Sequence, residues 1–559
     1  MSHDPAPIPR NTVACDDHAS PALLGGLSAV VASWCLVLLA GWLPHYLTRP
    51  WHVDSDHFAM LAQLWDSAGK VPYRDVFTMQ FPGEIYLYWA LGKLTGWGNT
   101  VAFNAVDAGM VVSLCLLMTA WSRRQFRTAL PGLIGASAFL TYYLDKDYTF
   151  TGQRDWHAAF EAMVGLIVLL GWSGRAARLV SAFAYALAVV TRPHFALLAP
   201  AMLIAAYHQP RTDVAPSRRG LRGLVEWGCF GIAALVLGFV PLIATGAFDD
   251  FLRCLRSITY GSGYNRVSPT TVVFRMFSQA SGRLSGVTVP ASILLLLLSS
   301  RVDARYRGAA WALLAAMAGL FLYAPVSPLF LPYSQFPFES VFAVATCLLA
   351  GLIVATGSRS IVHVTALLLL FGLVGLKKPE FVTFKGHYED RVVQYHGKAY
   401  ILKRKEYGIR EAIGFLKSGE LPVGNPPGFR DTLRPYPWDD LRGVIVYLRA
   451  HTTKETPVAN LTLDCAAAIT GVVPRLSPLP ADSFGLPIFP ELLLEPDLRA
   501  LRDSENCVVV WNPASAEAEF PGLAPIWESI RAHYRPEAKF GDLEIWRQGP
   551  RASGESKEK

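Results

Sequence analysis

Residues 22–56 read ALLGGLSAVVASWCLVLLAGWLPHYLTRPWHVDSD, and the chemical character of the chain changes abruptly within them. Residues 22–44 are almost entirely apolar. A helix needs roughly 20 such residues to cross the hydrocarbon core of a bilayer, where every backbone polar group must find a partner inside the protein. Two carboxylates, Asp54 and Asp56, come soon afterwards. The stretch therefore predicts a membrane-spanning helix that leads into an acidic loop.

Charge is distributed unevenly along the whole chain. Of its 559 residues, 52% are hydrophobic and only 17% are charged, whereas a soluble protein has roughly 25% charged residues. Residues 377–559 carry 25 Lys+Arg and 25 Asp+Glu, more than half of all the charges. The net charge of +7 thus belongs to residues 1–376, and it does not indicate nucleic-acid binding. The pattern excludes a uniform soluble protein, a disordered chain and a coiled coil, and it predicts a membrane domain followed by a water-soluble domain.

Apolar segments recur through residues 22–376, and we count eleven predicted membrane spans. Several of them are short for a lipid-exposed helix, so their boundaries are placed only to within a few residues. The predicted spans are 22–44, 99–121, 131–144, 157–173, 179–191, 195–207, 223–245, 285–300, 308–330, 339–356 and 360–376.

Basic residues between the spans predict the orientation, because Lys and Arg concentrate in cytoplasmic loops. Three arginine groups support an N-terminus in the cytoplasm: Arg123, Arg124 and Arg127; Arg218, Arg219 and Arg222; Arg301, Arg305 and Arg307. Residues 1–21 then form a cytoplasmic tail, and an odd number of spans puts residues 377–559 in the periplasm of a bacterial inner-membrane protein. The long loops 45–98 and 246–284 fall on the same outer side. Long loops usually serve a function, so we expect the chemistry there.

Residues 377–559 show the pattern of a small α/β domain. Helices are predicted at 404–418, 438–451, 488–502 and 522–533, and strands at 457–463, 507–511 and 543–547. No glycine-rich nucleotide loop accompanies them. Cys465 and Cys507 both lie in this domain, where a periplasmic location would permit a disulfide, and the sequence leaves that pairing open.

Several motifs along the chain resemble the GT-C glycosyltransferases, multispanning enzymes that take a sugar from a polyprenyl-phosphate donor. The Asp54–Asp56 motif follows the first span, a Gly69–Asp75 turn comes next, and Pro82 begins an apolar helix. Thr191–Pro193 resembles the basic stretch between two mid-domain helices, and Trp546–Arg547 resembles the end of the outer domain. The closest resemblance is to the subgroup of arabinose-lipid A, galacturonosyl and protein mannosyl transferases. Protein mannosyltransferases have Asp-Glu at the first motif, and its absence here argues against a protein acceptor.

The resemblance implies a helical polytopic membrane fold with two juxtamembrane helices in the first outer loop and catalytic carboxylates beside them. Asp54 is the predicted general base, since the essential acid of the family comes first in this motif; the alternative is a helix cap. Asp56 is also among the predicted catalytic residues, as a ligand of a divalent metal ion, and the alternative is that it caps the helix. Asp155 is predicted to orient the acceptor or to act as a second catalytic carboxylate beside Asp54; the alternative is a residue that stabilises the start of its helix.

A lipid-phosphate leaving group requires cations, and two places offer them. Arg192 and His194 lie at the outer ends of two predicted spans. Arg253, Arg256 and Tyr260 lie on one face of a predicted interfacial helix. All five are predicted donor-phosphate ligands, and the alternative for each group is anchoring at the membrane interface.

Four further residues are candidates with weaker patterns. Glu84, Arg154 and His157 are predicted to contact the acceptor or a metal ion. Asp107 lies inside the second span, where an acid suggests either a function or a hydrogen bond within the bundle.

The predicted function is transfer of a sugar from a polyprenyl-phosphate donor to a periplasmic glycan, lipid or protein. The only cofactor that the sequence suggests is a divalent metal ion, and no nucleic-acid partner is expected. Two other classes remain open: a transporter or flippase of lipid-linked sugars, and a non-catalytic envelope-assembly subunit. The absence of internal repeats and the position of the acids in loops favour the enzyme.

Overall fold

The fold was analysed in a computed structural model. It describes residues 21–48, 53–97, 99–144, 151–209, 217–261, 285–299, 302–326, 336–356 and 361–376 of the membrane part. In the remainder it describes 385–387, 391–395, 398–402, 406–418, 438–462, 490–514 and 521–549, with the separate positions 146, 268, 270, 473, 477–479 and 516. The side chains of Asp54, Asp56 and Tyr260 lie outside the described part, although their backbone is within it.

Each of the eleven predicted spans is helical. The helices are α1 (Pro21–Thr48), α4 (Thr100–Phe126), α5 (Leu130–Tyr143), α6 (Arg154–Gly171), α7 (Arg175–Thr191), η1 (Pro193–Leu198) continued by α8 (Ala199–Tyr207), α9 (Ser217–Ala244), α12 (Ser285–Leu298), α13 (Ala304–Val326), α14 (Phe336–Thr356) and α15 (Ile361–Gly375). Four of these, α1, α4, α9 and α14, are long and apolar enough to cross a membrane by length and composition alone. Shorter apolar stretches lie in η1 with α8, in α12, in α13 and in α15. The protein is therefore a polytopic, helical membrane protein.

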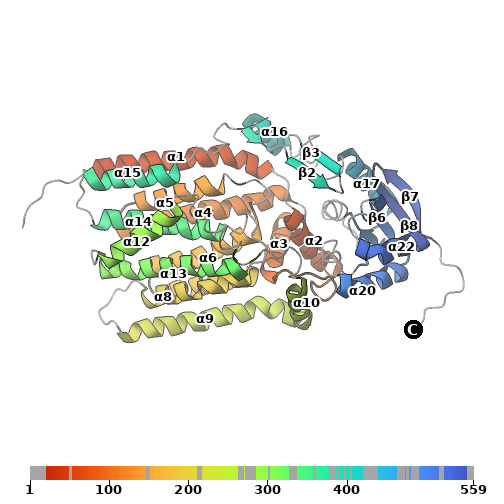
Figure 1. Cartoon of the computed structure of the whole chain (residues 1–559), viewed down its shortest axis with the longest axis horizontal. Helices are drawn as coiled ribbons and strands as arrows, with labels where there is room; N and C mark the ends of the chain where they lie inside the picture. The colour runs from red at the N-terminus through yellow and green to blue at the C-terminus, as the bar shows by residue number, and fades with distance from the viewer. Residues whose placement is uncertain are drawn as a thin grey trace, which may run out of the picture.

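The spanning helices run side by side, and the small sheet lies beyond one end of the bundle (Figure 1). Helix α14 is buried among its neighbours over most of its length. Gly135 of α5 faces it so closely that a Cβ atom there would lie 2.8 Å from the Ala343 carbonyl oxygen. Small residues of this kind let helices in a membrane approach each other, and packing then replaces the hydrophobic effect as the force between them.

Three helices, α2 (Val53–Ala68), α3 (Pro82–Thr95) and α10 (Phe248–Gly261), lie between the bundle and the C-terminal domain (Figure 1). This confirms the two helices expected in the first outer loop. Phe251 and Cys254 of α10 are buried with residues of α2 and α3, including Phe58 and Ile85. The ring of Phe251 contacts Tyr73, with 5.1 Å between ring centroids. The three helices thus form a second, smaller apolar core at one end of the bundle.

The C-terminal domain has a four-stranded sheet in the order β5 (Val458–Asn460), β6 (Val508–Trp511), β8 (Leu543–Gln548), β7 (Tyr534–Phe540). Strands β5 and β6 are parallel and the other two pairs are antiparallel. Helices α17 (Trp438–His451), α20 (Pro490–Asp503) and α22 (Ala524–His533, after η5, Pro521–Leu523) accompany it. The predicted α/β character and the helix at 438–451 are confirmed.

Two predictions for this domain were incomplete. The helix predicted at 404–418 begins only with α16 (Ile409–Ser418), because Glu406–Gly408 forms strand β4 and pairs with β1 (Lys385–His387). Strand β7 and the pair β2 (Arg391–Tyr395) and β3 (Lys398–Leu402) were not predicted. A strand is stabilised by a partner elsewhere in the chain, which local periodicity does not reveal.

One of the two cysteines considered for a disulfide lies in the described core of the C-terminal domain. Cys507 is a buried free thiol, and burial raises its pKa to about 11. Cys465 lies outside the described residues.

Phe77 and Met79 of the first outer loop pack against the cluster that contains Trp511. The first outer loop therefore contacts both domains.

Candidate active site

The Gly69–Asp75 turn of the first outer loop has a fixed and partly strained backbone. Gly69 has φ 65° and Tyr73 has φ 73°, an angle that a residue with a side chain rarely adopts. The hydroxyl of Tyr73 donates to the carbonyl of Gln80 at 2.7 Å. Arg74 contacts both carboxylate oxygens of Asp75, and it also donates to the carbonyl of Thr245 at 2.9 Å. The turn is thereby tied to the loop that precedes α10.

Asp75 is the charged residue of this turn that the structure explains best. The hydrogen bond from Arg74 lowers the pKa of Asp75 below its ordinary value, and partial burial opposes that shift. The backbone N–H of Val71 also donates to this carboxylate at 2.8 Å. Asp75 therefore holds the turn together as an ionised acceptor.

Asp54 and Asp56 lie in the first turn of α2, at the position expected from the sequence. The residues beside them, Ser55 and His57, are buried. The side chains of Asp54 and Asp56 are outside the described part. The role of Asp54 as base and that of Asp56 as metal ligand or cap therefore stay predictions.

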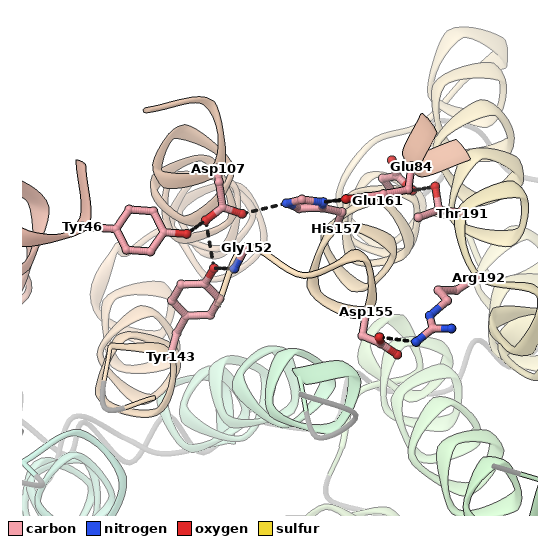
Figure 2. A network of polar contacts seen from close by, with 10 residues as sticks. All are labelled: Tyr46, Glu84, Asp107, Tyr143, Gly152, Asp155, His157, Glu161, Thr191 and Arg192. Carbon is pink, nitrogen blue, oxygen red and sulfur yellow. Dashed lines mark hydrogen bonds and ion pairs between the residues drawn. The ribbon is translucent and has the colours of Figure 1, made fainter. Parts of the chain in front are cut away.

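The beginning of α6 carries most of the other candidates. Gln153 precedes the helix in extended conformation, and Arg154 and Asp155 form its first turn. Positions 155 and 157 of a helix point about 200° apart, so that Asp155 and His157 must face different neighbours. Figure 2 shows this separation, with His157 in one row of polar side chains and Asp155 beside Arg192.

The first group is a buried chain of polar contacts, called here the His157 network: Tyr46, Glu84, Asp107, Tyr143 and His157. The Nδ1 atom of His157 lies 2.9 Å from Oε1 of Glu84, and its Nε2 atom lies 2.9 Å from Oδ1 of Asp107. The hydroxyls of Tyr46 and Tyr143 both donate to Oδ2 of Asp107, the latter at 3.0 Å. The five residues come from α1, α3, α4, α5 and α6 (Figure 2). This network is a set of mutually satisfied groups with very little contact with solvent.

The second group, called here the Asp155 cluster, consists of Arg154, Asp155, Arg192 and His194. Nη2 of Arg192 lies 2.5 Å from Oδ2 of Asp155, and Nε2 of His194 lies 4.0 Å from its Oδ1. Asp155 is completely buried. The predictions placed Asp155 among catalytic acids and Arg192 and His194 among phosphate ligands, and the fold brings the three together.

Arg154 has an unusual environment for a guanidinium. It is 9% exposed, and its Cζ atom lies 5.5 Å from the ring centroid of Phe58 in α2. Among the described residues, its Nε and Nη1 atoms have no hydrogen-bond partner. Buried donors without partners are costly, and native structures rarely leave them so. The guanidinium of Arg154 therefore offers unused hydrogen-bond donors of the kind that phosphate and carboxylate groups accept.

The other predicted phosphate ligands lie on α10. Arg253 and Arg256 are exposed, and Arg253 forms an ion pair with Asp250 on the same helix. The side chain of Tyr260 is outside the described part. The structure thus separates the two groups of predicted cations onto different elements, with Arg192 and His194 in contact with a buried carboxylate.

Among the described residues, no group of three or more His, Cys, Asp or Glu side chains could hold a metal ion. Glu84 and His157, predicted as acceptor or metal contacts, lie 2.9 Å apart (Oε1 to Nδ1), and their predicted roles stay predictions. A role for Asp56 in metal binding stays a prediction, because its side chain lies outside the described part.

Some members of the site were not predicted from the sequence. Tyr46, Tyr143 and Glu161 were absent from the predicted set, as was the role of Thr191, whose hydroxyl donates to Glu161 at 3.2 Å. The acid inside the second span, Asp107, was the available signal, because an intramembrane carboxylate must have donors around it. Which residues supply those donors could not be predicted from the sequence around Asp107.

In the described part of the chain, the helices at the eleven predicted spans, the three helices at one end of the bundle and the α/β domain beyond them form a polytopic helical membrane protein. The crystal structure of ArnT from Cupriavidus metallidurans, bound to undecaprenyl phosphate, matches with a TM-score of 0.53. The match covers 94% of this chain and 99% of that chain at 15% sequence identity, and it establishes the fold.

A second solved structure is also similar over most of the chain. The Archaeoglobus fulgidus oligosaccharyltransferase in complex with zinc and sulfate matches 92% of this chain and 72% of that chain, with a TM-score of 0.46 and 13% identity. No family model matches the sequence. No curated protein matches it either.

Proposed function

We propose that this protein is an integral membrane glycosyltransferase that moves a sugar from a polyprenyl-phosphate donor to an acceptor of the cell envelope. The GT-C fold over nearly the whole chain supports the class of reaction. The observation that carries the proposal is the Asp155 cluster, in which a buried guanidinium has donors without partners among the described residues. A lipid phosphate is an anion that would supply the missing acceptors at the end of a membrane bundle.

The reaction needs two charges of opposite sign around the sugar. The acceptor hydroxyl attacks the anomeric carbon, and its proton passes to a carboxylate, for which Asp54 is the candidate. The bond between that carbon and the phosphate oxygen breaks, and the phosphate leaves with the electron pair. Arg154, Arg192 and His194 would stabilise the negative charge that develops there, and Asp155 would hold Arg192 in place.

The proposed topology follows from the positive-inside rule. The N-terminal tail, residues 1–21, lies in the cytoplasm of a bacterial inner-membrane protein. The membrane domain, residues 22–376, presents loops 45–98 and 246–284 to the periplasm, together with the domain of residues 377–559. That domain contacts the first outer loop through Phe77 and Met79, which suits a role in acceptor recognition.

The test is a mass analysis of envelope lipids and glycans from a deletion strain. The strain would be complemented with the wild-type gene, with Asp54→Asn, or with Arg499→Gln as a control on the exposed face of α20. We expect one sugar substituent to be missing in the deletion and Asp54→Asn strains and present in the other two, at equal protein levels.

Different results would favour the other classes. Full restoration by Asp54→Asn would remove Asp54 as the base and point to Asp155, or to a non-catalytic subunit. Accumulation of the polyprenyl-linked sugar on the cytoplasmic side in the deletion strain would indicate a flippase. A deletion strain with unchanged lipids and glycans would contradict the proposed function.

A further inference from the structure

Helix α3 begins at a place where two independent contacts fix it to the bundle. Its first turn contains Gly83 and Glu84, and both are buried. Glu84 contacts His157 of α6, while Gly83 lies against Thr191, the last residue of α7. The next residue, Arg192, forms the ion pair with Asp155. The beginning of α3 therefore lies against the same helix end that carries part of the Asp155 cluster.

The contact through Glu84 depends on residues beyond it. Both nitrogens of the His157 ring face carboxylate oxygens, so each position requires a proton between nitrogen and oxygen. The three groups then share two protons and carry one net negative charge. One oxygen of Asp107 faces Nε2 of His157, and the other accepts from the hydroxyls of Tyr46 and Tyr143. The backbone N–H of Gly152 donates to the Tyr143 hydroxyl at 3.2 Å, which extends the network to the loop before α6.

The contact through Gly83 depends on the absence of a side chain. A Cβ atom at this position would lie 2.4 Å from Oγ1 of Thr191, and 2.7 and 2.8 Å from its backbone N and Cα. Backbone atoms cannot move away as the end of a flexible side chain can. Any larger residue would therefore push α3 away from α7.

We infer that Asp107 and His157 are positioning residues, which act through Glu84 to seat the beginning of α3, and with it the first outer loop, against the Asp155 cluster. Neither residue is assigned a contact with substrate. The inference rests on the proposed function for its effect on transfer, because a displacement of about 1 Å in a reacting group can cost roughly 100-fold in rate. The position of the first turn of α3 against His157 and Thr191, called here the seat of α3, is a property of the fold. It can be tested without measuring activity.

The first test compares two substitutions of Asp107 in the full-length protein. Asp107→Asn keeps the size and an acceptor oxygen, so the network can rearrange its protons and survive. Asp107→Ala removes the acceptor from His157, Tyr46 and Tyr143 together. We expect kcat per folded molecule to fall by roughly 100-fold in Asp107→Ala and by less than about 10-fold in Asp107→Asn, with KM for the lipid donor unchanged in both. A lower yield with wild-type kcat would mean a merely structural role and would overturn the inference.

The second test displaces α3 without changing a titratable group. It can be interpreted even if Asp107→Ala fails to fold. Gly83→Ala should lower kcat by about 10-fold or more because α3 must shift. The matched control is Gly109→Ala in α4, close in sequence to Asp107, where a new Cβ atom meets nothing within 4 Å. Equal kcat values for the two variants would contradict the inference.

A third measurement separates the seat from the proposed function. Hydrogen exchange of the amides in residues 82–95 is measured in detergent for the wild type and the three alanine variants. We expect faster exchange in Asp107→Ala and Gly83→Ala and no change in Gly109→Ala. Unchanged exchange in the first two would overturn the seat even if activity fell. Faster exchange, together with a wild-type protein that transfers no sugar, would support the seat and remove the proposed function.

Discussion

The His157 network and the Asp155 cluster each contain a residue near the start of α6, and His157 and Asp155 are two positions apart. The two groups differ in whether their buried polar atoms have hydrogen-bond partners. In the network, both ring nitrogens of His157 and both carboxylate oxygens of Asp107 have a hydrogen-bond partner on another helix. In the cluster, the guanidinium of Arg154 keeps two nitrogens without partners among the described residues. Both groups are buried, so burial alone does not mark a binding site.

The difference suggests how to separate structural from functional charges inside a membrane protein. A network whose members satisfy each other can hold helices in place without a ligand. A buried cation with unused donors is stable only if something else supplies acceptors. We therefore propose positioning for the His157 network and anion binding for the Asp155 cluster. Of the four substitutions below, Asp155→Asn and Arg154→Gln test that division, and Asp54→Asn and Asp75→Asn test the first outer loop.

The largest effect is expected from Asp54→Asn, which tests whether the chemistry belongs to the carboxylate that follows the first span. Loss of a general base should lower kcat by about 10²–10⁴-fold while donor binding is retained. The measurement is single-turnover transfer by purified protein, with Asp75→Asn as the control in the same loop. Comparable loss in the control would place the requirement in loop structure rather than in proton transfer.

A large effect on stability is expected from Asp155→Asn. The substitution removes the negative partner of Arg192 inside the protein, and loss of one partner of a buried ion pair costs about 3–5 kcal/mol. Unfolding in detergent would measure it. Glu495→Gln, which breaks an exposed ion pair on α20, should leave stability unchanged. A stable Asp155→Asn protein would show that the cluster does not depend on its carboxylate.

A moderate effect on binding is expected from Arg154→Gln. A hydrogen bond to a charged group contributes about 1.5–3 kcal/mol, which corresponds to an affinity for undecaprenyl phosphate about 10–100-fold weaker. Stability should change little, because the variant no longer buries a cation with unpaired nitrogens but also loses a positive charge near Asp155. The control is Arg499→Gln. Unchanged affinity for this probe would remove Arg154 from the proposed phosphate site and would weaken the distinction between the two groups.

The smallest effect is expected at Asp75, whose partly buried side chain is 27% exposed and pairs with an exposed arginine. Arg74 lowers the pKa of Asp75 from its ordinary value near 3.8. The unfolded chain therefore binds a proton more readily, so the stabilisation is present above that value and is lost as the pH falls through the lower folded pKa. Asp75→Asn should flatten the dependence of Tm on pH below about 4, and added salt should weaken the wild-type effect. An unchanged acid profile would contradict the assignment.

Much of the fold could be predicted from the sequence because the deciding forces are local. Each span is an apolar run long enough to satisfy its own backbone in lipid, and all eleven are helical. The helix at Trp438–His451 was predicted to the residue from its amphipathic pattern. Strand β4 was predicted as helix and β7 was not predicted, because their hydrogen-bond partners lie elsewhere in the chain.

The candidate site divides in the same way. The sequence by itself identified Asp155, Arg192, His157 and Glu84 as chemically notable, since charged residues near or inside membrane spans require a reason. Only the tertiary structure decided their partners. His157 contacts residues 73 and 50 positions away in the chain, and Arg192 contacts one 37 positions away. Hydropathy and helical periodicity act over a few turns, whereas such contacts depend on how whole helices pack, and that packing decides which charges are satisfied and which are left to bind a ligand.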